Sequence, residues 1–179
     1  MRKFLPILAA LIVVGFALLG AAAQAPQGQG QGRGQAAAPR TLGVDVATAK
    51  KMVAAAEAAA IAANAQVAIA IVDNNGDLVF FERMDGASAR AVTSAQGKAR
   101  AALLFGLPTK EVQDAIAAGK PVTATITAPA AGAWELTTGQ GGLPILKDGK
   151  VVAAIGCGGS LPANDEKFAQ AGITAMGNK

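Results

Sequence analysis

The stretch Gly139-Gln-Gly-Gly-Leu-Pro-Ile-Leu-Lys-Asp-Gly-Lys-Val-Val-Ala-Ala-Ile-Gly-Cys-Gly-Gly-Ser160 decides the fold of this chain. It contains two apolar runs, residues 143–146 and 151–155, on either side of a turn centred on Asp148-Gly149. An Asp-Gly pair readily takes the positive φ angles that a tight primed turn requires. The two runs are therefore predicted to pair as an antiparallel β-hairpin.

Glycines lie at both ends of this hairpin, three in residues 139–142 and three in residues 156–159. Because glycine has no side chain, the backbone there can closely approach a ligand or another subunit. The first cluster precedes a strand, whereas dinucleotide and phosphate loops open a helix, so close packing is the favoured reason for it. We expect a ligand pocket between the sheet and a helix at residues 89–105.

The composition is that of one domain with a core of small side chains. The chain has 179 residues, of which 52% are hydrophobic, largely alanine, and only 4% aromatic. Its formal charge of +4 comes from Arg2, Lys3, Arg33 and Arg40, and the remaining chain is neutral. Without a clustered basic face, nucleic acid is not expected as a partner.

The N-terminus has the pattern of an export signal. Arg2-Lys3 precede an apolar run at residues 4–19 and small residues at 21–23, which predicts a signal peptide over residues 1–23. The run is shorter than the roughly 20 residues of a membrane span, so no stable membrane insertion is expected after cleavage. Residues 24–41 read as a flexible Gln/Gly-rich leader, and residues 42–179 as the folded domain of a periplasmic or secreted protein.

The rest of the chain predicts helices and strands that fit around the hairpin. Helices are expected at residues 44–64, 89–105, 108–117 and 162–176, a second hairpin at residues 67–81, and one more strand at residues 122–126. This order indicates an α+β fold, a single domain in which helices cover one or both faces of a largely antiparallel sheet.

Several short motifs occur in a recognisable order along the chain. They are Val72-Asp-Asn-Asn-Gly76, Phe81-Glu-Arg-Met-Asp-Gly86, Lys98-Ala99, Phe105-Gly-Leu-Pro-Thr109, Gly141-Gly-Leu-Pro-Ile145, Ala154-Ile-Gly156 and Asp165-Glu166. Together they resemble the GlcG/HbpS family of haem-binding or haem-degrading HbpS-like proteins. The resemblance implies a profilin-like or PAS-like domain that assembles into homo-oligomers, from dimer to octamer, with some members exported and binding haem.

Haem is the cofactor that this resemblance implies, yet the chain has no histidine and no tyrosine. Histidine and tyrosine are the two residues that most commonly bind haem iron in proteins. Met52, Met84, Met176, Cys157, threonines and lysines remain as iron ligands. The haem propionates could pair with Arg83, Arg90 or Lys98.

The residues predicted to contact a ligand are Arg83, Met84, Asp85, Lys98, Gly141 and Gly142, and the sequence assigns neither catalytic residues nor metal ligands. Each position has a structural alternative. Arg83 and Asp85 could form a salt-bridged corner between strand and helix, and Lys98 could be a solvated lysine. The glycines could serve close packing alone.

Four further residues have competing interpretations. Asp165 and Glu166 could form an acid/base pair, but acids in a first helical turn also suit the helix dipole. Cys157 could be a metal ligand, a redox thiol, a cross-subunit disulfide or an ordinary buried cysteine. Trp134 could stack on a flat ligand or belong to the core.

The sequence thus predicts an exported small-molecule-binding protein whose ligand is haem or another flat or small organic molecule. Two alternatives remain open. One is a lyase or isomerase acting on a small organic acid, with Lys98 and a carboxylate as acid/base groups. The other is a structural oligomer without a ligand.

Overall fold

The helices and strands of the computed structural model follow one another in the order expected for an α+β protein. The model describes residues 43–127, 129–130 and 132–177, so the predicted signal peptide and leader lie outside the described residues. Its elements are α1 (Val46–Ala62), β1 (Ala68–Asp73), β2 (Leu78–Arg83), α2 (Ala89–Phe105), α3 (Thr109–Ala117), β3 (Gly142–Lys147), β4 (Lys150–Gly158) and α4 (Pro162–Met176). The predicted fold class is confirmed. No helix in the described part of the chain has the length and hydropathy needed to cross a membrane.

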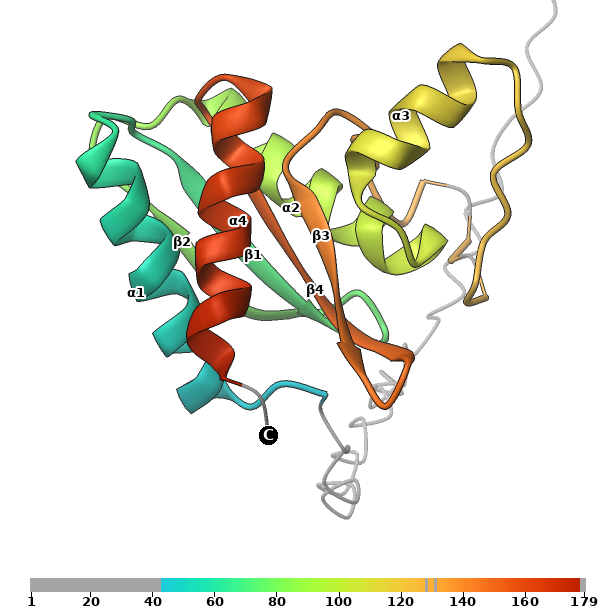
Figure 1. The fold of residues 1–179 in the computed structure, drawn as a ribbon, viewed down its shortest axis with the longest axis horizontal. Coiled ribbons are helices and arrows are strands. Elements are labelled where there is room, and N and C mark those ends of the chain that lie inside the picture. Colours follow the sequence, from blue (N-terminus) through green and yellow to red (C-terminus); the bar gives the residue numbers. More distant parts are fainter. Residues whose placement is uncertain (1–42, 128, 131, 178–179) are drawn as a thin grey trace, which may run out of the picture. The chain divides into compact units, whose positions relative to one another are not determined.

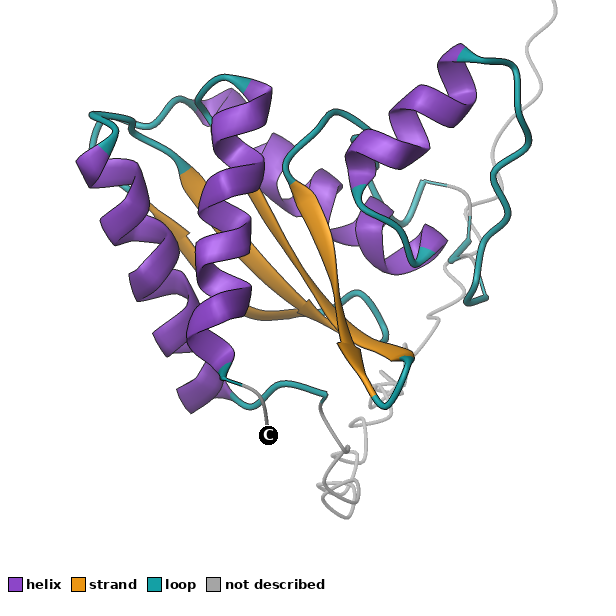
Figure 2. Ribbon diagram, in the orientation of Figure 1, coloured by secondary structure: helices purple, strands orange, loops and turns teal. Residues whose placement is uncertain are grey.

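The four described strands form one antiparallel sheet in the order β2-β1-β4-β3. Helices α1 and α4 lie side by side on one face, and α2 lies behind the sheet on the other (Figure 1). Figure 2 shows the same arrangement as a layer of strands between layers of helices. The predicted late hairpin is β3 and β4, and its two-residue turn has φ angles of 51° at Asp148 and 73° at Gly149.

The two faces of the sheet carry side chains of different size. On β1, Ile69 and Ile71 point into the core beneath α1 and α4, whereas Ala68 and Ala70 lie beneath α2. The small face lets α2 approach very closely, because a Cβ atom on Gly156 would lie 2.2 Å from the Ala95 carbonyl oxygen. The opening expected between hairpin and α2 is therefore closed at this point. Space lies instead beyond the end of β4.

The predicted strand at residues 122–126 is wrong, because no part of this segment joins the sheet. Its backbone polar groups are partly satisfied by a helix end. The backbone N–H and hydroxyl of Thr125 both donate to the Leu104 carbonyl, at 2.8 and 3.2 Å. Further along, Trp134 packs against Gly76 and the α2 side of the core, which favours its interpretation as a core residue.

Candidate functional site

A buried ion pair joins the two helical layers at one end of the sheet. Lys98 projects from α2 and Asp165 from the first turn of α4, which lie on opposite faces. Lys98 Nζ lies 2.7 Å from Asp165 Oδ2 and donates also to the Cys157 carbonyl oxygen at 2.9 Å. The two side chains are only 6% and 3% exposed, so the interpretation of Lys98 as a solvated lysine is wrong.

Two glycines at the start of β3 make room for this pair. Gly141 has a φ of +125°, and a Cβ atom there would lie 2.7 Å from Asp165 Cβ and 2.9 Å from Lys98 Nζ. Next to it, a Cβ on Gly142 would lie 2.4 Å from the Lys98 carbonyl oxygen, and the Gly142 N–H donates to the buried Thr109 hydroxyl at 2.9 Å. The structure therefore brings together three of the predicted residues, Lys98, Gly141 and Gly142.

Asp165 is held by hydrogen bonds on both of its carboxylate oxygens. Oδ1 accepts from the Ser160 N–H at 3.0 Å, and Oδ2 accepts from Lys98. Burial raises the pKa of this carboxyl, while Lys98 and the backbone N–H groups of Ser160 and Gly159 act in the opposite direction. A carboxylate held in this way anchors the lysine ammonium. Its role thus goes beyond the helix-dipole interpretation.

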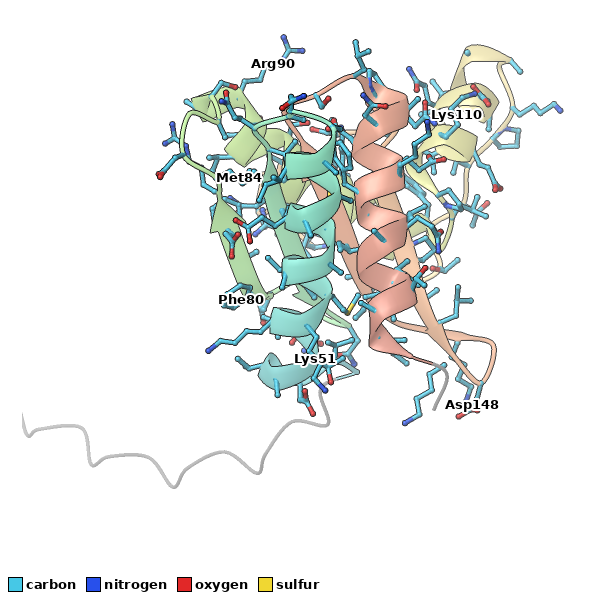
Figure 3. All side chains as sticks on the ribbon, turned by 60° about the vertical axis from the view of Figure 1, so that its left-hand side comes forward. Lys51, Phe80, Met84, Arg90, Lys110 and Asp148 are labelled. Carbon is cyan, nitrogen blue, oxygen red and sulfur yellow. The ribbon has the colours of Figure 1, made fainter. Side chains whose placement is uncertain are left out.

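A polar pocket of about 330 Å³, here called the Lys98 pocket, opens beside the ion pair. Its wall comes from the N-terminal half of α2, the connection from β4 to α4, the first turn of α4 and residues 137–140. Residues 137–140 approach α2 because Gly97 leaves space for Thr137. Polar side chains in the wall, besides Lys98 and Asp165, are Ser88, Arg90, Ser94, Thr137, Gln140 and Ser160. Arg90 is exposed, and Figure 3 shows it at the end of the molecule opposite the Asp148 turn.

Of the six predicted residues, only Lys98 is in the described wall of the Lys98 pocket, and Arg83, Met84 and Asp85 also lie away from the ion pair. The Arg83 guanidinium donates to the Ala87 carbonyl from Nε at 2.9 Å and from Nη2 at 2.6 Å, which ties the end of β2 to the start of α2. Met84 packs against the core beneath α1 and α4, and Asp85 is exposed. Figure 3 shows Phe80 on β2 and Met84 just beyond the end of this strand. A corner between strand and helix thus exists, with a carbonyl as the partner of Arg83.

A larger cavity of about 460 Å³ lies at the opposite end of the β3–β4 hairpin, between the start of α1 and the Asp148 turn. Its charged wall residues, Asp45, Lys147 and Asp148, are exposed. Because it holds no buried charged side chain among the described residues, the Lys98 pocket is the better candidate site.

Cys157 has the environment of an unreactive thiol. The residue is fully buried, and burial raises the pKa of its thiol. A thiol that neither ionises nor meets solvent is a poor nucleophile and a poor partner for a disulfide between subunits. We expect a thiol reagent such as DTNB to label Cys157 only after unfolding in urea. Fast labelling of the folded protein would contradict this environment.

Asp165 should give unfolding an unusual pH dependence. Since the folded-state pKa lies above the ordinary value of 3.8, the folded protein holds this proton more tightly than the unfolded chain does. The stabilising contribution of Asp165 is then complete below that value and is lost as the pH rises through the raised pKa. We expect the wild type to lose stability relative to Asp165→Asn as the pH rises above about 4, as measured by urea unfolding. The opposite trend would mean that attraction to Lys98 outweighs burial.

Sequence reasoning missed Asp165 as the partner of Lys98, because the two positions are 67 residues apart and share no local pattern. It also missed Ser160 and Gln140 as wall residues. One signal was present in the sequence. Glycines cluster where the chain enters β3 and leaves β4, at the same end of the hairpin. Because they have no side chains, a long side chain such as that of Lys98 can pass this end of the sheet.

The fold and site define a small α+β domain with an antiparallel sheet and a polar pocket at one end. Residues 44–174 match the family described as "Haem degrading protein HbpS-like", and the chain belongs to this family. It is 37% identical over 90 residues to the protein GlcG of Escherichia coli K12, a stretch that spans half of this chain and 62% of GlcG, less than two thirds of that relative.

Solved structures have the same fold. A crystal structure of HbpS matches with a TM-score of 0.65 and 31% identity, covering 75% of this chain and 91% of HbpS. The crystal structure of a PduOC–haem complex matches with a TM-score of 0.64 and 24% identity, covering 74% of this chain and 94% of PduOC. At that identity the second likeness establishes the fold alone.

Proposed function

We propose that this HbpS-like protein binds a small organic molecule in the Lys98 pocket. The observation that carries the proposal is the buried lysine in the pocket wall. An ammonium group has three N–H donors. Two are directed to Asp165 and Cys157, and the third has no acceptor among the described residues. A buried donor held in place but not satisfied is suited to hydrogen-bond a ligand.

Haem is the specific candidate that the family description supports. The two propionates of haem would suit Lys98 and Arg90. The wall, as far as the structure describes it, includes no methionine or cysteine, and the chain has no histidine or tyrosine. Met52 and Cys157 are buried in the core, and Met84 and Met176 pack against it. Of the ligand types left to the chain, the wall holds Lys98, whose ammonium is engaged by Asp165, and Thr137. The pocket therefore offers no strong axial ligand for haem iron, and any haem bound there would be held mainly through its carboxylates.

Titration with hemin, followed in the Soret region, tests whether haem is the ligand. Binding in the pocket predicts a saturable spectral shift that weakens in Arg90→Gln and is unchanged in Lys51→Gln, a control that removes an exposed cation from α1. No shift at excess protein would remove haem from the proposal. A shift equally strong in both variants would place haem elsewhere on the protein.

We further propose that the protein is exported and acts as a homo-oligomer in the periplasm or outside the cell. Support comes from the signal-like pattern of residues 1–23 and from the family resemblance. Native mass spectrometry of protein isolated from its own compartment would report both the mature N-terminus and the number of subunits. A full-length monomer recovered from the cytoplasm would contradict both parts.

A further inference from the structure

We infer that the Lys98 pocket takes a short organic acid, bound through its carboxylate, in preference to a porphyrin. This inference rests on the proposed function, because it names the class of ligand for the same site.

The charges in the wall favour an anion. Among the described residues of the wall, Lys98 and Arg90 are the cations and Asp165 is the one acid. The negative charge of Asp165 is already balanced by Lys98 and by the Ser160 N–H. Arg90 therefore gives the wall a net positive charge. The third N–H of Lys98 lies deeper in the wall than the Arg90 side chain.

Two helix N-termini add to this positive potential. The wall includes Ser88, the N-cap of α2, and Pro162, the first residue of α4. Each helix N-terminus carries a partial positive charge. The cap of α4, Leu161, makes no side-chain hydrogen bond to the helix. The partial charges of both helices and the Lys98 ammonium thus act on the same small volume, where a carboxylate gains most.

The size and lining of the pocket exclude a macrocycle more readily than a short acid. Its volume of about 330 Å³ is at the lower end of the range of about 300–1,000 Å³ for small-molecule sites. The wall residues that the structure describes supply hydroxyls and one amide, from Ser88, Ser94, Thr137, Gln140 and Ser160, and no aromatic ring. Trp134, which could have stacked on a porphyrin, packs against Gly76 instead. A flat apolar ring would leave these polar groups unsatisfied.

The test is a titration of the mature wild-type protein, followed by ¹⁵N NMR, with propionate, lactate, succinate and the neutral isostere propionamide. We expect the acids to shift the amide signals of Ser94, Gly139 and Ser160, and to bind at least about tenfold more tightly than propionamide, as for the gain of one charge-assisted hydrogen bond. Arg90→Gln should weaken acid binding by about tenfold, and Lys51→Gln should leave it unchanged.

The outcomes separate this inference from the proposed function. Equal affinity for propionamide and propionate, or hemin binding that depends on Arg90 without any detectable acid binding, would overturn the acid but retain a ligand site. If acids, amide and hemin all leave the pocket signals unmoved, both the inference and the proposed function fail. Ser94→Val, which changes a half-buried wall residue, provides a second variant if Arg90→Gln is poorly soluble.

Discussion

Lys98→Met is expected to lower the free energy of unfolding by about 3–5 kcal/mol at neutral pH, the usual cost of removing one partner of a buried ion pair. Methionine fills a similar volume, so the loss comes from electrostatics. The Asp165 carboxylate, 3% exposed, would stay buried without its counter-ion. The Cys157 carbonyl would lose its lysine donor as well. Urea unfolding of the single variant measures this loss.

The double variant Lys98→Met/Asp165→Asn distinguishes an electrostatic cause from a packing defect. Removing both charges leaves no uncompensated ion, and replacement of a whole buried pair is often nearly neutral. The asparagine side-chain oxygen can still accept from the Ser160 N–H. We expect the double variant to recover most of the stability lost by the single one. If the stability losses of the single variants Lys98→Met and Asp165→Asn simply add in the double variant, the two charges do not interact energetically.

Gly156→Ala is expected to lower the free energy of unfolding by about 3 kcal/mol, at the upper end of the usual cost of overpacking a core. The new methyl group would lie 2.2 Å from the Ala95 carbonyl oxygen and 2.5 Å from the Ala99 backbone nitrogen. Both are helix backbone atoms, which cannot move aside like a flexible side chain. Helix α2 must therefore shift away from the sheet.

Gly139→Ala is the matched control for this substitution. It adds the same methyl group at a glycine whose closest neighbour would be Thr137 Cγ2, at an ordinary 3.9 Å. Thermal or urea unfolding should show a large loss for Gly156→Ala and a small change for Gly139→Ala. Similar losses for the two variants would mean that α2 does not rest on the sheet backbone as the structure has it.

Local patterns in the sequence were sufficient for most of the fold. The Asp148-Gly149 turn was predictable because few residue pairs accept positive φ at two successive positions. The end of α1 was predictable for a related reason, since Asn64 takes a φ of 52° just beyond the helix. The prediction for residues 122–126 failed because alternating polar and apolar residues form a strand only where a sheet edge is available. The alternation itself does not show whether such an edge exists.

Only part of the candidate site was predictable. Of the six residues predicted to contact a ligand, Lys98 lines the pocket, and Gly141 and Gly142 pack against Lys98 without lining it. Arg83, Met84 and Asp85 lie elsewhere. Asp165 looked like a common first-turn acid because its partner comes from another layer of the fold. Such pairs depend on how helices from opposite faces meet at the end of a sheet, and no short stretch of sequence contains that information.

The unequal faces of the sheet bear on how this protein can diverge. Beneath α1 and α4, branched side chains such as Ile69 and Ile155 fill the space, and exchanges among similar aliphatic residues there cost little. Beneath α2, the contacts are made mostly by alanines and by the backbone itself. In related sequences, the residues beneath α1 and α4 should therefore vary among aliphatic types. The residues beneath α2 should stay small. The helix that carries Lys98 should thereby keep its position against the sheet even where the opposite layer is repacked.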